Sequence, residues 1–291
     1  MLHVNKFGVL HPNFTRRYYD QLNQKYLQEI CALTKRLFIQ NRRRPSLMLT
    51  GIIQPLLWLL LFSALFQNAP VQLFTSTDKY SDFMSSGMIV FTAFTSSLNA
   101  GLPLIFDREF GFFNRLLSSP LHSRYSIILS ASFNIFCNNV LQVTSIIYTC
   151  SLKGTAVPNF HNIQLIIWIL FLLGNSITNI SLMLGFLLPG HVELLACIII
   201  INLPLLFSST ALAPLIFMPS WLQVIASINP LSYAIETVRY AYLNQSWNCE
   251  SIIMQNVWGS VTVITIFALF IGSNLICLAL IWKLISNKFE D

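Results

Sequence analysis

The chain has 291 residues, of which 55% are hydrophobic and 10% are charged, and its mean hydropathy is +0.64. These are too few polar residues to cover a soluble globule of this size, which excludes soluble enzymes and binding domains and indicates an integral membrane protein. The net charge of +6 indicates membrane topology and contact with anionic lipids, not nucleic-acid binding, because basic residues cluster beside an apolar stretch.

Residues 1–45 are expected to form a cytoplasmic tail that contains an amphipathic helix. No apolar core typical of a cleavable signal peptide follows the first residues. Further on, apolar residues recur every three or four positions and line one helical face: Leu22, Tyr26, Ile30, Leu33 and Leu37. This predicts a helix on the inner membrane surface, which the adjacent Arg42, Arg43 and Arg44 favour. A helix packed on a soluble partner is the alternative.

Six apolar stretches are long enough for a helix to cross a hydrocarbon core of about 30 Å. They lie at about 47–66, 83–106, 125–150, 163–188, 192–217 and 260–284. These stretches predict an all-α membrane protein, in which residues 46–285 form a six-helix transmembrane domain and residues 286–291 a cytoplasmic tail.

The distribution of basic residues predicts the orientation, because loops rich in lysine and arginine stay cytoplasmic. If the N-terminus is inside, only Lys79, Lys153 and Arg239 of the 17 lysines and arginines fall on the outer side. Both termini are therefore expected to be cytoplasmic.

A charged segment at 106–125, FDREFGFFNRLLSSPLHSRY, lies between two apolar stretches. A helix here can place Phe110, Phe112, Phe113 and Leu116 in a partner's groove, while its charges set the orientation. We expect this cytoplasmic helix to couple the membrane domain to a partner; a membrane-surface helix without a partner is the alternative. The candidate coupling residues are Asp107, Arg108, Glu109, Phe110, Gly111, Phe113 and Arg115.

The segment 214–242 is apolar, but prolines at 214, 219 and 230 disfavour one straight helix. A re-entrant pair of short helices on the outer side is expected, because irregular backbone at membrane depth must be buried in protein or face water. Glu236 and Arg239 are three residues apart and are expected to pair with each other, the alternative being contact with a second protomer. The candidate cap residues are Pro219, Trp221, Asn229, Pro230, Tyr233, Glu236 and Arg239.

Amide side chains recur at helical spacing within two of the predicted spans. Asn134, Asn138 and Gln142 share a face of the third span, and Asn175 and Asn179 share a face of the fourth. Hydrogen bonding between helices is the favoured interpretation, and a translocation surface is the alternative.

Motifs for catalysis and for ligand binding are absent from the sequence. The six cysteines and five histidines lack metal-ligand spacing, and no GxSxG nucleophile motif occurs. Without GxxxxGK[ST] the chain is not expected to hold ATP, or any other cofactor, itself. No Asp, Glu, Lys or Arg lies at the centre of a predicted span, so a separate ATPase is favoured over an ion gradient as the energy source.

Two segments together resemble the ABC-2 type transporter permeases. Residues 107–111, DREFG, are similar to the E-R-E-x-G signature of the loop after the second helix, and LLSSP at 116–120 continues the resemblance. PSWLQ at 219–223, NPLSY at 229–233 and Arg239 are similar to the signature before the last helix. The chain departs from the pattern where Asp107 replaces the usual Glu and where Phe-Phe-Asn replaces a Thr-Leu-Glu type run. The resemblance covers about residues 25–285.

This resemblance implies the membrane subunit of an ABC exporter, acting as a homodimer or with a similar permease. ATP and Mg²⁺ would then be held by a separate nucleotide-binding subunit, on which the 107–120 helix docks. The membrane is expected to be a bacterial inner membrane or a plastid membrane. A non-transporting scaffold that recruits a cytoplasmic partner is the alternative function, and a gradient-driven carrier or channel is the third. The sequence does not identify a substrate.

Overall fold

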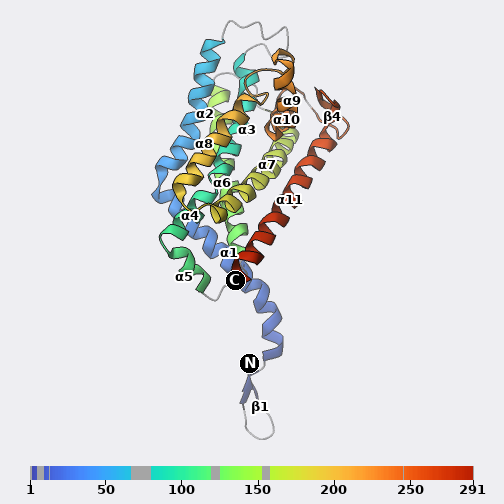
Figure 1. Ribbon diagram of the computed structural model, residues 1–291. Helices are drawn as coiled ribbons and strands as arrows, with labels where there is room; N and C mark the ends of the chain where they lie inside the picture. The colour runs from blue at the N-terminus through green and yellow to red at the C-terminus, as the bar shows by residue number, and fades with distance from the viewer. Residues whose placement is uncertain are drawn as a thin grey trace.

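The computed structural model describes residues 2–4, 10–12, 14–66, 80–118, 125–152, 158–244 and 246–290. Nearly all of them are helical (Figure 1). The helices are α1 (Phe14–Arg43), α2 (Pro45–Leu65), α3 (Tyr80–Leu98), α4 (Gly101–Glu109), α5 (Phe112–Ser118), α6 (Tyr125–Leu152), α7 (Phe160–Leu187), α8 (His191–Phe207), α9 (Ser220–Ile228), α10 (Pro230–Leu243) and α11 (Val263–Glu290), with a 3₁₀ turn at Leu215–Phe217.

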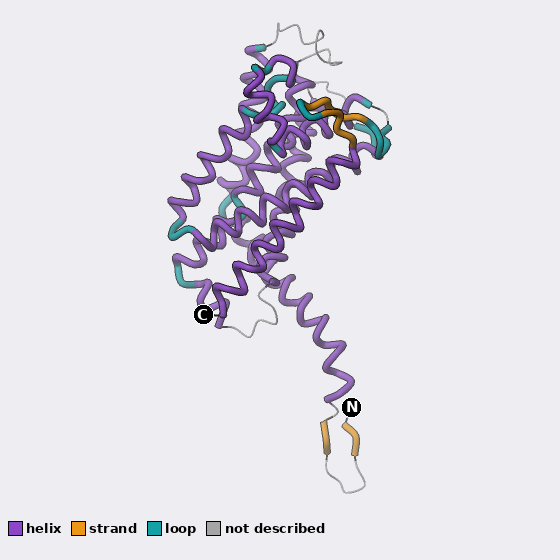
Figure 2. The backbone as a smooth tube through the Cα atoms, turned by 45° about the vertical axis from the view of Figure 1, so that its right-hand side comes forward, coloured by secondary structure: helices purple, strands orange, loops and turns teal. Residues whose placement is uncertain are grey.

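The long helices form one bundle and run roughly parallel to each other (Figure 2). Helices α3 and α7 lie at its centre, because they pack against most of the others. α3 packs against α2, α6, α7 and α10, while α7 also packs against α4 and α11. Large side chains of α3, such as Phe83, Phe91 and Phe94, are at most 1% exposed. By contrast, α2 and α11 present long apolar faces to the outside, on which residues such as Leu61 and Leu275 are exposed. Such faces are expected of helices in contact with lipid or another chain.

Within the described residues, five helical stretches are long and apolar enough to span a membrane, which makes the chain a multi-pass membrane protein. They are Met48–Leu65, Asp82–Glu109, Tyr125–Leu152, Phe160–Leu187 and Val263–Leu284. The second of these is not continuous, because α3 ends at Leu98 and α4 begins at Gly101.

The predicted span at 192–217 was too long. Its helix, α8, has 17 residues and ends at Phe207. Pro204 lies in its last turn, and beyond it the chain is held by side chains from distant helices. Asn229 donates to the carbonyl of Leu205 at 2.8 Å, and Arg239 donates to the carbonyl of Thr210 at 2.9 Å. Carbonyls that accept these bonds no longer need helical partners, so the helix can end early.

Small residues allow α4 and α7 to lie in direct contact. The amide of Gly101 donates to the hydroxyl of Ser181 at 2.9 Å, and that hydroxyl donates to the carbonyl of Leu98. A Cβ atom on Gly101 would lie 2.4 Å from the Ser181 carbonyl oxygen, and one on Gly185 would lie 3.2 Å from the Gly101 carbonyl oxygen. Ser181 and Gly185 are four residues apart, the small-xxx-small spacing typical of membrane helix contacts.

The N-terminal helix α1 packs against α6 near its C-terminal end, while its first half extends away from the bundle (Figure 1). It starts at Phe14, earlier than the predicted stripe. Of that stripe, Ile30, Leu33 and Leu37 are half-buried. The placement of α1 on a membrane surface stays a prediction. The orientation of the termini also stays a prediction, and Lys79 and Lys153, two of the three basic residues expected on the outer side, lie outside the described residues.

Two short antiparallel strand pairs were not predicted. β1 (Leu2–Val4) pairs with β2 (Leu10–Pro12), and β3 (Ile252–Asn256) pairs with β4 (Gly259–Thr262) just before α11. Neither pair has the Asn-Gly or Asp-Gly turn by which a hairpin is recognised in a sequence; the turn between β3 and β4 is Val257-Trp258. The all-α expectation is therefore correct for the bundle but not for these two hairpins.

Candidate functional site

The segment at 106–118, here called the elbow, joins α4 to α5 at the end of the bundle opposite α9 and α10 (Figure 1). Gly111 forms the bend, with a φ angle of +70°. The amide of Phe110 donates to the carbonyl of Phe106 at 2.9 Å, and that of Gly111 donates to Arg108 at 3.2 Å. Glycine adopts this left-handed conformation with little strain, which explains its place directly after the helix.

Arg108 binds the chain where α7 ends. Its guanidinium donates to the carbonyls of Gly185 at 3.1 Å, Phe186 at 3.0 Å and Pro189 at 2.8 Å, and also to that of Leu188. The last carbonyls of a helix have no partners within the helix, and a cation is favourable at that end. Arg108 therefore caps α7 and is committed to contacts within the chain.

The two carboxylates beside Arg108 reach other helices. Glu109 accepts hydrogen bonds from the backbone amide of His191 at 2.7 Å and pairs with the ring Nδ1 of His191 at 2.6 Å, which fastens α4 to the N-terminus of α8. Asp107 forms an ion pair with Arg36 of α1. The guanidinium of Arg36 also lies 4.0 Å from the centre of the Phe112 ring. The elbow is thus connected to α1, α7 and α8.

The predicted coupling residues divide into a buried set and an exposed set. Phe113 is 5% exposed and packs edge-on against Phe186, with ring centres 5.8 Å apart. Phe110 is 76% exposed, and Phe112 and Arg115 are exposed too. A partner that docks on the elbow therefore meets Phe110, Phe112 and Arg115, whereas Phe113 holds the elbow on the bundle.

A cavity of about 370 Å³ lies beside the elbow, between α1, α2, α6 and the break between α3 and α4. We call it the amide cavity. Its polar wall consists mainly of amide side chains: Gln40, Asn41, Gln54, Asn99, Asn134, Asn138 and Gln142. Its apolar wall includes Met48, Leu102, Phe106 and Leu195. Such a mixture of apolar surface with a few polar groups is typical of small-molecule sites.

The amide stripe of the third predicted span faces this cavity. Asn134, Asn138 and Gln142 of α6 all line it, and all three are at most 8% exposed. The amide of Asn41 on α1 donates to Asn134 at 3.1 Å. This contact is a hydrogen bond between two helices, as was predicted from the helical spacing of the amides.

The amides of the fourth predicted span do not line the amide cavity. Asn175 donates to Asn274 of α11 at 2.8 Å, so it joins two helices. Asn179 is 1% exposed, and neither of its amide atoms has a hydrogen-bond partner among the described residues. The same interpretation was predicted for both stripes, but among the described residues it is the α6 stripe that lines the amide cavity.

At the other end of the bundle, α9 and α10 form the expected pair of short helices. Pro219 precedes α9, and Pro230 is the first residue of α10. Between them, the Asn229 side chain accepts from the amide of Leu231 at 3.0 Å and donates to the hydroxyl of Ser208 at 3.1 Å. Asn229 therefore caps α10 and also ties it to the end of α8.

Tyr233 connects α10 to its neighbours. Its hydroxyl donates to the carbonyl of Ser227 at 2.6 Å and accepts from Asn256 of β3 at 2.9 Å. Trp221 of α9 is 65% exposed and takes no part in this packing.

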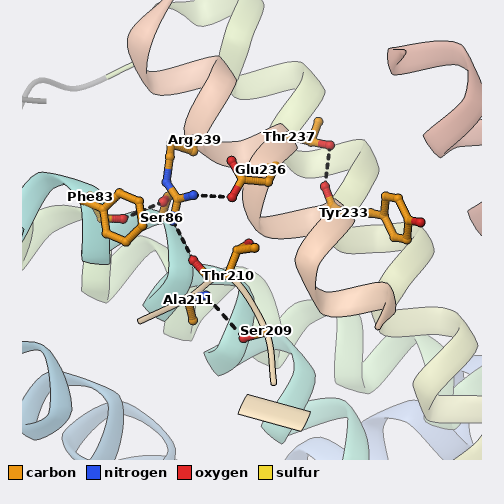
Figure 3. A network of polar contacts seen from close by, with 9 residues as sticks. All are labelled: Phe83, Ser86, Ser209, Thr210, Ala211, Tyr233, Glu236, Thr237 and Arg239. Atoms are coloured by element: carbon orange, nitrogen blue, oxygen red, sulfur yellow. Dashed lines mark hydrogen bonds and ion pairs between the residues drawn. The ribbon is translucent and has the colours of Figure 1, made fainter. Parts of the chain in front are cut away.

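Arg239 lies at the centre of a buried polar network (Figure 3). It is 6% exposed, forms the predicted local ion pair with Glu236, and donates to the carbonyl of Thr210. Its guanidinium lies 3.7 Å from the centre of the Phe83 ring on α3. The pairing inferred from the spacing is confirmed, and the contact with α3 was not predicted.

Sequence reasoning missed several partners of the candidate residues. No contact was predicted for Arg36, His191 or Asn41. None of the three contacts has a local signal, because the partners are 71, 82 and 93 residues apart in the sequence. Ser119 and Pro120 of the elbow motif lie outside the described residues. Within the described part of the chain, no group of three or more His, Cys, Asp or Glu residues could hold a metal ion.

Comparison with known proteins supports the resemblance to ABC-2 type transporter permeases that the two sequence motifs indicated. The family model for the ABC-2 type transporter matches residues 28–243, which include the elbow, the amide cavity and the α9–α10 pair. The chain is 53% identical to a Porphyra purpurea protein named transport permease ycf38, with 84% of each chain covered. It is 48% identical to its Pyropia yezoensis counterpart, covering 93% and 94%. It is also 26% identical to the daunorubicin resistance ABC transporter permease protein DrrB1 of Streptomyces coeruleorubidus, covering 67% and 68%. The chain therefore belongs to the ABC-2 type transporter family and is a permease subunit of an ABC transporter.

Proposed function

We propose that this permease is an exporter subunit driven by ATP hydrolysis on a separate nucleotide-binding subunit, which would hold ATP and Mg²⁺. The observation that carries the proposal is the construction of the elbow. It exposes Phe110, Phe112 and Arg115 at one end of the bundle, while Arg108 and Glu109 tie it to other helices. A surface of aromatic and arginine residues on a firmly held helix is suited to binding a partner protein.

The contacts of the elbow would transmit movement of that partner into the membrane domain. A push on α5 reaches α1 through Asp107 and Arg36, α7 through Arg108, and α8 through Glu109. α1 also forms one wall of the amide cavity. Closure of the nucleotide-binding subunits would therefore change the cavity and switch it from inward-facing to outward-facing access.

The remaining features of the proposal come from the family and its members. The resistance function in the name of the Streptomyces relative favours export. The algal relatives favour a plastid membrane over a bacterial inner membrane. The permease would act as a homodimer or with a similar chain, with both termini on the cytoplasmic or stromal side.

The test is capture of an ATPase by the tagged chain in mild detergent, followed by identification of bound proteins and an ATPase assay. Phe110→Ser removes the most exposed aromatic side chain of the elbow. Phe160→Ser is the matched control, because Phe160 is 87% exposed at the opposite end of α7. Reversal of charge at Glu109 is a poorer probe, since it also breaks the contact with His191.

We expect the wild type and Phe160→Ser to retain an ATPase subunit and Phe110→Ser to lose most of it. If the wild type retains none, the coupling proposal is wrong and the scaffold or the gradient-driven carrier takes its place. Equal capture by all three chains would place the docking surface elsewhere.

A further inference from the structure

The amide cavity has unused hydrogen-bonding capacity. The buried oxygens of Gln40, Asn138 and Gln142 have no hydrogen-bond partner among the described residues. Asn138 and Gln142 are 8% and 5% exposed, so bulk water does not compensate them fully. Most buried polar groups in proteins are paired. The side chains of these three residues line the cavity, so a turn of each amide would let its unpaired oxygen bind a ligand or a water molecule there.

The charges around the cavity restrict the ligand. Of the lining residues only Arg44 and Asp107 are charged, and Asp107 is already paired with Arg36. Arg44 is exposed, with its guanidinium 5.2 Å from the centre of the Phe106 ring. One cation cannot neutralise a polyphosphate or another multiply charged anion. A cationic ligand is disfavoured as well, because the lining residues include no unpaired carboxylate that could bind it. An uncharged ligand fits the cavity best.

Amides select for hydroxyl groups, because each amide both donates and accepts hydrogen bonds and a hydroxyl does the same. An amide can also rotate by 180° and present either its oxygen or its nitrogen to the cavity. The facing wall is apolar and includes Met48 and Leu195. The ligand therefore has a hydroxylated part and an apolar part.

We propose that the amide cavity binds the uncharged, hydroxyl-rich head of an amphiphile, a sugar attached to an apolar tail, and that this is the substrate class of the transporter. The second half of this proposal rests on the proposed function, whereas the binding itself does not. Asn138 and Gln142 bind the head, and the apolar wall accepts the start of the tail.

Binding is tested on the purified full chain, without nucleotide or ATPase subunit, by native mass spectrometry. The probes are a monoglucosyl diacylglycerol, the diacylglycerol with the same acyl chains, and the corresponding phosphatidic acid. The variant is Asn138→Leu with Gln142→Met, which keeps side-chain volume and removes both amides. The control is Asn175→Leu, an amide of the other stripe that contacts Asn274 and not the cavity.

The wild type and Asn175→Leu should bind the glucosyl lipid at least about tenfold more tightly than the diacylglycerol, since each hydrogen bond contributes up to about one order of magnitude. The double variant should lose this preference and still bind diacylglycerol, which shows that it is folded. A preference that survives in the double variant, an equal affinity for the glucosyl lipid and diacylglycerol, or a stronger affinity for phosphatidic acid would each overturn the head-group assignment.

The substrate role is tested separately, with the ATPase subunit captured by the wild-type chain and both reconstituted in liposomes. Glucosyl lipid should stimulate ATP hydrolysis by the wild type and not by the double variant. A complex that hydrolyses ATP but does not respond to the bound lipid overturns the substrate role alone. Failure of the wild type to capture any ATPase overturns the proposed function, and the measured head-group preference would then describe a lipid-binding site.

Discussion

Replacement of two arginines of the elbow, Arg108 and Arg115, is predicted to affect different properties: stability in the first case and binding of the ATPase subunit in the second. Arg108→Gln removes a guanidinium that donates to four carbonyls, three of them partly buried. If each of the three partly buried bonds contributes about 1 kcal/mol, the usual net value for a hydrogen bond in a protein, the loss in the free energy of unfolding is about 3 kcal/mol. Glutamine is shorter and uncharged and cannot replace these contacts. Arg115→Gln changes an exposed side chain and should change the free energy of unfolding by less than about 0.5 kcal/mol.

The assay combines unfolding with capture of the ATPase subunit. The purified variants are unfolded by increasing the mole fraction of dodecyl sulfate in mixed micelles and followed by circular dichroism. Arg108→Gln should unfold at a clearly lower fraction, whereas Arg115→Gln should unfold with the wild type but capture less ATPase. Arg108→Lys is the conservative control, because it restores the charge but reaches fewer carbonyls, so it should recover part of the loss.

If Arg108→Gln unfolds with the wild type and captures less ATPase, Arg108 is a docking residue and its contacts with the end of α7 contribute little. If Arg115→Gln is as destabilised as Arg108→Gln, the division of the elbow into holding and docking residues is wrong.

Three further substitutions test the packing. Gly101→Ala should cost about 1–3 kcal/mol in the free energy of unfolding, because the added Cβ meets the Ser181 backbone; a wild-type unfolding curve would contradict this close contact. Gly111→Ala meets no atom within 4 Å but must keep a φ of +70°, so a smaller loss of about 1 kcal/mol is expected, and a loss as large as that of Gly101→Ala would disagree. Arg239→Met leaves the Glu236 carboxylate without its cation, at about 3–5 kcal/mol. Adding Glu236→Gln should recover part of that loss in the same dodecyl sulfate titration, and strict additivity would show that the pair is not coupled.

The elements predicted correctly are those that local chemistry determines. Pro219 and Pro230 lack the amide hydrogen that a helix interior requires, so the break into α9 and α10 could be read from them. Glu236 and Arg239 are neighbours on any helix, and their pairing follows from spacing alone. In each case the residues that decide the structure lie within one or two turns of each other.

The elements predicted wrongly depend on contacts between distant parts of the chain. The composition of 192–217 suits a spanning helix, yet α8 ends at Phe207. The last turn of α8 and the chain beyond it are bound by Asn229 and Arg239, which lie 24 and 29 residues from the carbonyls of Leu205 and Thr210. Hydropathy averages over a window and cannot detect such bonds. The contacts of Arg108 with the carbonyls at the end of α7 were not predicted for the same reason, because those carbonyls lie 77 to 81 residues away in the sequence.

The amide stripes show what periodicity can and cannot establish about a membrane pathway. Helical spacing places Asn134, Asn138 and Gln142 on one face, but it does not say what that face meets. In the bundle this face meets a cavity, which α1, α2 and the break between α3 and α4 enclose on the other sides. The stripe residue Asn175 instead meets α11 and is paired there. Amides in spans therefore become candidates for a pathway only where a break in a neighbouring helix leaves them space.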